Sequence, residues 1–174
     1  MRRGSVFAAA ALCALPAGCG QDERDADPPP RRGLIVPQRS IDTLALGMSA
    51  EDVRRLYGRP DTVKRFSASE TGTPIEDWLY RHKGMTVELH RMGAGRFELK
   101  ALFTTSAAQR TEAGAGVGSS LEEVTRAVDD IDCGREDPGE RWCTLGGDAI
   151  GDPQTVFMLR RGKVFKVVVI ETFR

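Results

Sequence analysis

The chain has 174 residues, which suits one ordinary domain or two small ones. Hydrophobic residues make up 40% and charged residues 29%, as in proteins that fold in water. Basic and acidic residues number 25 each, and loss of a leader containing Arg2 and Arg3 would leave a net charge of −2. This balance argues against nucleic-acid binding, which requires a basic surface.

Residues 1–18 have the layout of a bacterial export signal. Arg2 and Arg3 precede an apolar run over residues 6–15, and small residues follow. The run is too short to span a bilayer as a helix, which takes about 20 residues. We therefore expect a signal peptide over residues 1–18.

The sequence Leu15-Pro16-Ala17-Gly18-Cys19 resembles the lipobox of bacterial lipoproteins, although the family usually has leucine where this chain has Pro16. The resemblance implies cleavage before Cys19 and lipidation of that cysteine. Residues 21–37 are polar and proline-rich and cannot bury a core. We therefore expect residues 19–40 to be a lipidated cysteine followed by a disordered linker, with an ordinary secretory signal and a secreted protein as the alternative.

Two of the four cysteines are accounted for by the signal peptide and the lipid. The remaining two, Cys133 and Cys143, are expected to form a disulfide in an oxidising compartment. A metal site would need more ligands, and the chain has only two histidines, His82 and His90. We predict neither a metal site nor a cofactor.

A short helix with its own start signals occurs twice. Ser49 with Asp52, and Ser120 with Glu123, have the spacing of a capping box. Gly58 and Pro60 end the first copy. The apolar residues expected to dock the two helices are Val53, Leu56 and Tyr57 in the first copy and Val124, Ala127 and Val128 in the second.

Alternating apolar and polar residues predict strands after each helix. The last strand, residues 164–170, is apolar on both faces and is therefore expected in the middle of a sheet. A tight turn is expected at residues 82–84. The predicted strands are residues 61–67, 77–81, 85–90 and 97–103 after the first helix, and residues 155–159 and 164–170 after the second.

Landmarks recur in the same order in both halves of the chain. The helices lie 71 residues apart, and three further pairs follow at similar spacing: Trp78 and Trp142, Val87 and Val156, Gly95 and Gly162. We therefore predict an α+β fold of two tandem copies of a small unit, over residues 41–108 and 114–174. Each unit has one helix and an antiparallel sheet of three to four strands. Because about 60 residues make a marginal core, the units are expected to pack together.

The stretch from Gly47 to Pro60, with Trp78 and Tyr80, resembles the SmpA/OmlA (BamE-like) outer-membrane lipoproteins. The tandem arrangement is similar to the β-lactamase-inhibitor-protein fold. The first resemblance implies an envelope partner such as a β-barrel assembly component. BamE-like proteins carry one unit, whereas this chain has two.

No catalytic constellation is visible. The glycine-rich residues 111–120 lack the lysine of a phosphate-binding loop, so we interpret them as a linker ending in a helix cap. His82 and His90 have no nucleophile motif nearby and are expected at the surface. Trp78 and Tyr80 share a strand face, which indicates either a partner-binding patch or a core.

The sequence thus favours a non-enzymatic, lipid-anchored protein of the bacterial envelope that binds another envelope protein. One alternative is an inhibitor of a secreted hydrolase, with a loop such as Ser67–Pro74 or Asp148–Gln154 entering the cleft of its target. Another alternative is a protein that binds a small ligand between the two units. We predict no nucleic-acid partner.

Overall fold

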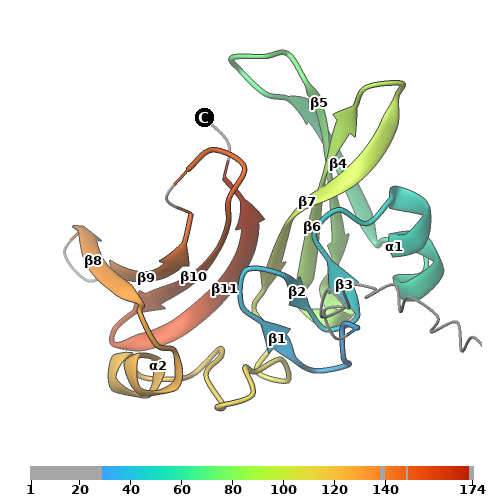
Figure 1. The fold of residues 1–174 in the computed structure, drawn as a ribbon. Coiled ribbons are helices and arrows are strands. Elements are labelled where there is room, and N and C mark those ends of the chain that lie inside the picture. The colour runs from blue at the N-terminus through green and yellow to red at the C-terminus, as the bar shows by residue number, and fades with distance from the viewer. Residues whose placement is uncertain (1–28, 138–139, 148, 173–174) are drawn as a thin grey trace, which may run out of the picture.

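A computed structural model describes residues 29–137, 140–147 and 149–172 (Figure 1). Eight antiparallel strands form one sheet in the order β4-β5-β6-β7-β11-β10-β9-β8, and three short strands form a second sheet, β1-β2-β3. The elements in chain order are β1 (Ile35–Val36), β2 (Ser40–Ile41), β3 (Leu44–Ala45), α1 (Ala50–Tyr57), β4 (Thr62–Ser67), β5 (Pro74–Tyr80), the 3-10 turn η1 (Arg81–Lys83), β6 (Met85–Met92), β7 (Arg96–Thr104), α2 (Leu121–Ala127), β8 (Asp132–Asp137), β9 (Glu140–Gly146), β10 (Pro153–Arg160) and β11 (Lys163–Glu171).

The predicted α+β class with two separate sheets is wrong, because the described chain is mostly β. The physical reason is the pairing of β7 with β11 from Thr104 opposite Val167 to Ala101 opposite Ile170, which joins the two strand sets into one continuous sheet. The helices have only 8 and 7 residues. The predicted boundary between linker and first unit, at residues 40 and 41, falls inside β2.

The helices begin as their sequences predict. Ser49 Oγ accepts the N–H of Asp52 at 3.1 Å, and Ser120 Oγ accepts the N–H of Glu123 at 3.2 Å. Only the second helix has the full capping box, because the Glu123 carboxylate also accepts the N–H of Ser120 at 2.6 Å. We expected Leu56 to dock the first helix, but it is 41% exposed. The buried residues of this helix are Val53 and Tyr57.

Each helix is attached to the sheet by the same main-chain bonds. Gly47 N–H donates to Leu99 O, and Leu99 N–H donates to Met48 O, each at 2.8 Å. In the second half Gly118 N–H donates to Val164 O, and Val164 N–H donates to Ser119 O, also at 2.8 Å. One helix followed by four strands therefore occurs twice along the chain, although all eight strands belong to one sheet.

A β-bulge also occurs at equivalent places in the two halves. In β7 the extra residue is Lys100, between Leu99 and Ala101, where the register with β6 shifts. In β11 the extra residue is Phe165, where the register with β10 shifts. An extra residue bends a strand and increases its twist, so both halves of the sheet curve in the same way.

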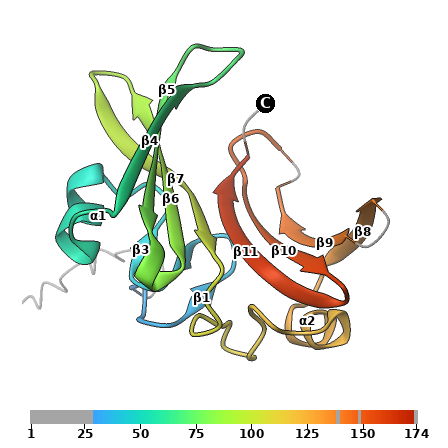
Figure 2. The same ribbon diagram turned by 180° about the vertical axis from the view of Figure 1, so that it is seen from behind.

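The register decides which side chains face the core. Cross-strand partners share a face, so a row of inward residues crosses most of the sheet. This row consists of Val63, Trp78, Val87, Leu102, Val169, Thr155 and Leu145. Both α-helices and the β1-β2-β3 sheet pack on this side, as Figures 1 and 2 show. As predicted, β11 lies in the interior of the sheet.

Trp142 does not occupy the place that corresponds to Trp78. Trp142 pairs with Met158, and Cys143 pairs with the buried Phe157, so Cys143 faces the core and Trp142 faces the other way. The predicted equivalence of the two tryptophans is therefore wrong by one residue. A shift of one position in a strand moves a side chain to the opposite face.

A polar cluster closes the junction of the two halves. Lys100 Nζ lies 2.6 Å from carboxylate oxygens of both Glu98 and Glu171, and its side chain is 7% exposed. Nearby, Gln38 N–H donates to Thr155 Oγ1 at 2.6 Å. These contacts tie the N-terminal segment and the first half to β10 and β11.

Candidate binding surface

The side of the eight-stranded sheet that faces away from the core is called the open face here. Two cross-strand rows of its side chains run across most of the sheet, and none of their members belongs to the core cluster. Both α-helices lie on the opposite side (Figure 2). The two rows are Lys64, Asp77, Glu88, Ala101, Ile170 and Gln154, and Thr62, Leu79, Thr86, Phe103, Val168, Val156 and Thr144.

Exposed apolar residues gather at one end of the open face, called the hairpin end. Four large apolar side chains of the described residues are exposed, and two of them lie here: Phe66 at 46% and Met92 at 40%. Phe66 is the last but one residue of β4, and Met92 ends β6; a third exposed residue, Ile150, lies in the loop between β9 and β10. A hollow of about 610 Å³ separates the β4–β5 and β6–β7 hairpins at this end. Such a concentration of apolar surface is typical of a protein-binding site.

Acidic groups lie in the first half of the open face. Asp77 and Glu88 are direct cross-strand neighbours. Partial burial, followed by the charge of Glu88, raises the pKa of Asp77, while Lys64 and His90 lower it. Asp77 Oδ1 is buried and accepts no hydrogen bond within the described chain. A buried acceptor without a donor costs free energy, so a ligand that supplied a donor here would be favoured.

The second half of the open face is apolar at the corresponding positions. Trp142 and Met158 are direct cross-strand neighbours, as Asp77 and Glu88 are in the first half. A Cβ atom on Gly134 would lie 2.5 Å from the Trp142 ring, so the glycine leaves space for the indole. Only a residue without a side chain allows the ring this close to β8.

Trp78 and Tyr80 do not form a surface patch. Their exposures are 2% and 0%, so they belong to the core rather than to a partner-binding site. Arg54 covers the Trp78 ring at 4.6 Å, and Tyr80 Oη donates to Gly58 O at 3.2 Å. Burial raises the pKa of Tyr80 to about 12.

The two histidines have different surroundings. His82 is exposed at the turn, as expected, and its Nδ1 lies 3.4 Å from Asp61. The expectation of a surface position is wrong for His90, which is 9% exposed with Nε2 2.6 Å from Glu88 Oε1. His90 alternates with inward residues as predicted, but the side chains of the curved open face bury one another.

The predicted disulfide between Cys133 and Cys143 is present and joins β8 to β9. Cys143 is fully buried. Cys19, the predicted lipidation site, lies outside the described residues.

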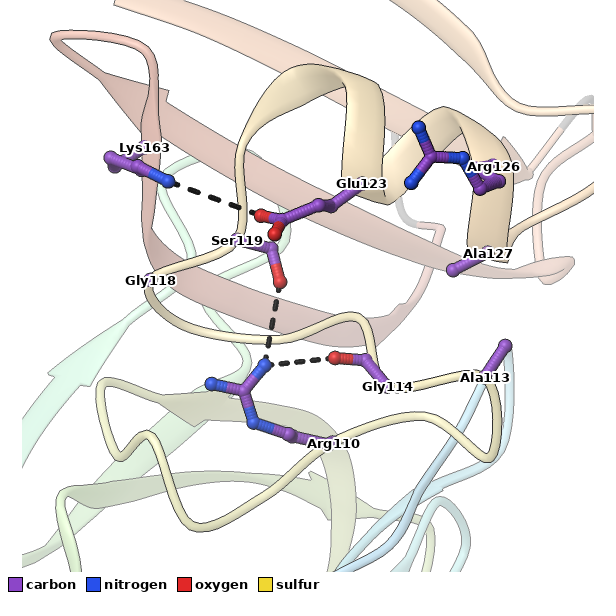
Figure 3. A pocket seen from close by; sticks show the side chains of 9 residues that line it. All are labelled: Arg110, Ala113, Gly114, Gly118, Ser119, Glu123, Arg126, Ala127 and Lys163. Atoms are coloured by element: carbon purple, nitrogen blue, oxygen red, sulfur yellow. Dashed lines mark hydrogen bonds and ion pairs between the residues drawn. The ribbon is translucent and has the colours of Figure 1, made fainter.

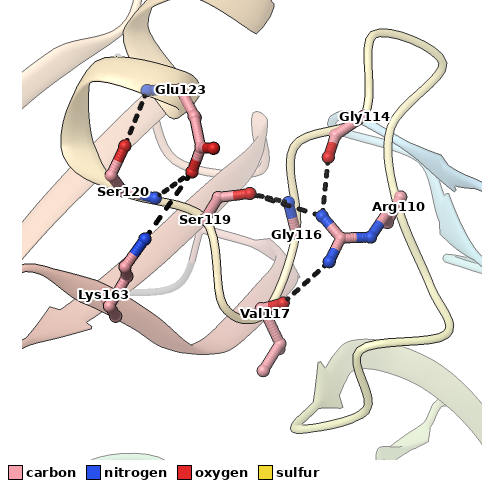
Figure 4. Close-up of polar contacts among 8 residues, drawn as sticks. All are labelled: Arg110, Gly114, Gly116, Val117, Ser119, Ser120, Glu123 and Lys163. Atoms are coloured by element: carbon pink, nitrogen blue, oxygen red, sulfur yellow. Dashed lines mark hydrogen bonds and ion pairs between the residues drawn. The ribbon is translucent and has the colours of Figure 1, made fainter.

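The glycine-rich segment forms a folded linker rather than an anion cradle. The Arg110 guanidinium donates to Gly114 O at 2.8 Å, to Val117 O at 3.3 Å and to Ser119 Oγ at 3.4 Å (Figure 4). The main-chain N–H groups of this segment also have partners within the structure. Gly114 N–H donates to Thr111 O, Gly116 N–H to Ser119 Oγ and Gly118 N–H to Val164 O.

A hollow of about 480 Å³ beside this linker contains three basic side chains, Arg110, Arg126 and Lys163 (Figure 3). Two of them already have acidic partners. Arg126 lies 2.5 Å from Glu122, and Lys163 lies 3.9 Å from Glu123. With Arg110 held by carbonyl groups, the hollow has little capacity left for an anion.

Among the described residues, no three histidine, cysteine, aspartate or glutamate side chains gather as metal ligands. In the same part of the chain, no helix has the length and apolar character needed to cross a membrane.

No protein-family model matches this sequence, and no curated protein matches it. Among solved structures, the chain is similar to an extracellular protein containing a SCP domain from Bacillus anthracis str. Ames, with 11% identity and a TM-score of 0.46. The similarity covers 72% of this chain and 44% of that one. At this level it supports no conclusion about fold or function.

Proposed function

We propose that this chain is a non-enzymatic protein of the bacterial envelope that binds another protein through the hairpin end of its open face. In this proposal Cys19 carries the lipid that anchors it. The partner is an envelope protein with an apolar contact surface, and a component of β-barrel assembly is the candidate that the resemblance to BamE-like lipoproteins suggests.

The observation that carries the proposal is the position of Phe66 and Met92. These two exposed apolar side chains, from β4 and β6, point to the same side of the sheet, the side that is not part of the core. Exposing them to water is unfavourable, and covering them with a partner would regain roughly 25 cal/mol for each Å² of apolar surface removed from water. The hollow between the hairpins gives that partner room to insert a side chain.

A matched pair of positions tests this proposal. Phe66 and Leu56 are exposed to similar extents, 46% and 41%, but Leu56 lies on α1, on the opposite side of the sheet. A photo-crosslinking amino acid at position 66 should give a discrete adduct in intact cells, whereas position 56 should not. Equal adducts at both positions, or none at position 66, would contradict the proposal.

Partner identity follows from the adduct. Mass spectrometry of the position-66 adduct should identify an envelope protein, and the double change Phe66→Ser with Met92→Ser should abolish its capture while Leu56→Ser leaves it unchanged. If the captured chain is a secreted hydrolase, the alternative below is supported instead.

Inhibition of a secreted hydrolase is a second candidate, supported by the β4–β5 loop within the predicted segment Ser67–Pro74. Ala68 N–H donates to Thr73 O at 2.9 Å, and Gly72 N–H donates to Ala68 O at 2.8 Å. The loop thus has a fixed shape and extends beyond the sheet (Figure 1). A preordered loop loses little entropy when it enters a cleft. Assays of secreted β-lactamases with the purified chain should show inhibition that Glu70→Ala weakens.

Anchoring is tested separately. Cys19→Ser should move the protein from the membrane fraction to the soluble fraction. If fractionation does not change, Cys19 does not carry the anchor, and the secreted alternative is favoured.

A further inference from the structure

The eight-stranded sheet ends in two edge strands, β4 and β8, and they differ in regularity. The pairing of β8 with β9 contains a β-bulge between Arg135 and Asp137. A bulge at an edge hinders the addition of another strand. By contrast, all six residues of β4 pair with β5 without a register shift, and β4 contains no proline. The outer edge of β4 is therefore regular enough to accept a further strand.

The register shows which main-chain groups of β4 point outward. Ala68 N–H donates to Thr73 O at 2.9 Å, and this pair continues the register of β4 with β5. In an antiparallel pair, residues alternate between bonding the neighbouring strand and pointing away from it. Residues an even number of positions before Ala68 therefore bond β5. The residues whose N–H and C=O groups point to the outer edge are Val63, Arg65 and Ser67.

These outward groups are open to a partner. In the described chain they form no hydrogen bond, because no strand lies beyond β4 in the sheet. The last four residues of β4, from Lys64 to Ser67, have exposed side chains. An edge with free main-chain groups can bind an extended segment of another protein by adding it as a further strand.

The side chains of β4 indicate the chemistry of such a segment. Phe66 lies on the open face, and so does Lys64 two positions before it. Lys64 is the cross-strand neighbour of Asp77 but forms no ion pair within the described chain, so its ammonium group can also meet a carboxylate on the outer side. Arg65 points to the other face, where its Nε lies 2.8 Å from Glu76.

A second copy of this chain suits the edge poorly. The only charged residues of β4 are Lys64 and Arg65, and both are basic. Antiparallel pairing of two copies about the middle of β4 would place one of these residues opposite its own copy. Like charges directly opposite each other are unfavourable in a sheet. The charge of β4 is instead complementary to an acidic segment.

We propose that β4 binds the partner protein by strand addition, through an extended segment with an acidic residue two positions from an apolar one. The acidic side chain lies beside Lys64 and the apolar side chain beside Phe66. The main chain of the segment bonds the outward groups of Val63, Arg65 and Ser67. This inference rests on the proposed function, because it states how the partner at the hairpin end is held.

A proline at position 65 tests the strand addition. Arg65→Pro removes an outward N–H and no bond to β5, and proline is tolerated in an edge strand at such a position. Arg65→Ala is the matched control, since it loses the same ion pair with Glu76 but keeps the N–H. With the protein identified from the position-66 adduct as the probe, Arg65→Pro should weaken binding at least about tenfold, and Arg65→Ala should bind like the native chain.

The outcomes separate the two proposals. If Arg65→Pro binds that protein as tightly as Arg65→Ala does, strand addition is rejected while the contact at Phe66 stands. If position 66 gives no adduct in the native chain, the protein contact is rejected, and strand addition with it.

Hydrogen exchange of the native chain tests the same pairing without a substitution. On binding the partner, the amides of Val63, Arg65 and Ser67 should exchange at least about tenfold more slowly, because they gain acceptors. The amides of Lys64 and Phe66 already bond β5 and should change less. Absence of slowing at the three outward amides would overturn the proposal even if Arg65→Pro fails to fold.

The acidic character of the segment is tested by removal of one charge. Lys64→Gln should weaken binding about two- to fivefold, whereas Arg161→Gln, at an exposed turn of the second half, should not. Equal affinities of the two variants would reject an acidic segment. Sedimentation of the purified chain should show a monomer, and a dimer that Arg65→Pro dissociates would show that a second copy occupies the edge instead.

Discussion

The two halves of the sheet are built on one backbone plan and completed by different side chains. Both have the same helix attachment and the same β-bulge, at Lys100 and at Phe165. At the position facing the core beside the bulge, the first half has Trp78 opposite Val87, and the second half has Cys143 opposite Phe157. A large ring in one half and a disulfide in the other therefore fill equivalent space.

The open face differs more than the core. The neighbouring acids Asp77 and Glu88 of the first half correspond to Trp142 and Met158 of the second. Core positions are restricted by packing in both halves, whereas outward positions are free to differ. The two halves therefore differ mainly in their outward residues, and changes at equivalent positions test this comparison.

The largest contrast is expected between the two tryptophans. Trp78→Ala removes a ring that is 2% exposed and should lower the free energy of unfolding by about 3–5 kcal/mol. Trp142→Ala removes a half-buried ring from the open face and should cost about 1 kcal/mol. Urea unfolding measures both, and similar losses would show that the two rings have similar burial.

The disulfide is the counterpart of Trp78 in the second half. Cys133→Ser with Cys143→Ser opens a loop of about 11 residues, so chain entropy predicts a loss of about 2.5–3 kcal/mol. The first half, which has no disulfide in its described residues, should keep its hydrogen-exchange protection. Equal loss of protection in both halves would show that the sheet unfolds as a unit.

The junction between the halves depends on Lys100. Lys100→Met leaves Glu98 and Glu171 facing each other and should cost about 1–3 kcal/mol, less than for a fully buried pair because the two carboxylates remain 35% and 27% exposed. Lys100→Arg is the control and should cost less. If Lys100→Met is as stable as the native chain, the cluster does not hold the halves together.

The same lysine predicts a pH dependence at alkaline pH. Burial lowers the pKa of Lys100, but hydrogen bonds to Glu171 and Glu98 outweigh this, and the net shift is upward from 10.5. Its contribution to stability is therefore full below pH 10.5 and is lost as pH rises through the folded-state pKa. Thermal unfolding of native and Lys100→Met chains should converge there.

The helix caps should matter equally in the two halves. Ser49→Ala and Ser120→Ala each remove one hydroxyl that accepts a main-chain N–H, at 3.1 and 3.2 Å. Each change should lower the free energy of unfolding by about 1 kcal/mol. Ser69→Ala, in the exposed β4–β5 loop, is the control. A difference above 1 kcal/mol between the two caps would show that the helices contribute unequally to stability.

The smallest effect is expected at Asp77. Because its pKa is raised in the folded state, the ionised carboxylate destabilises the protein at neutral pH. This penalty disappears as pH falls through the raised pKa toward the unfolded value of 3.8. Asp77→Asn should therefore be slightly more stable than the native chain at pH 7 and equal to it near pH 3.

Local elements were predictable from the sequence because local residues determine them. The first helix, Ala50–Tyr57, lies between the predicted cap Ser49 and the predicted terminating Gly58, since both signals are within ten residues of each other. The hairpin joining β10 and β11 and the interior place of β11 also followed from residue patterns.

The candidate sites were less predictable. Trp78 and Tyr80 could be recognised as sharing a face, but periodicity does not say whether that face is covered, and the structure buries both. Phe66 and Met92 showed no signal in the sequence, because single apolar residues at strand ends are common. Asp77 and Glu88 lie on different strands, and their pairing gave no motif in the sequence.

The sequence by itself determined the two capped helices, six of the strands (β4–β7, β10 and β11) and the cysteine pair, because each depends on neighbouring residues or on simple counting. Tertiary structure alone decided that β7 and β11 would pair, and thus that two expected units would become one sheet with a single open face. That choice depends on hydrogen bonds between strands more than sixty residues apart, which local propensity does not encode.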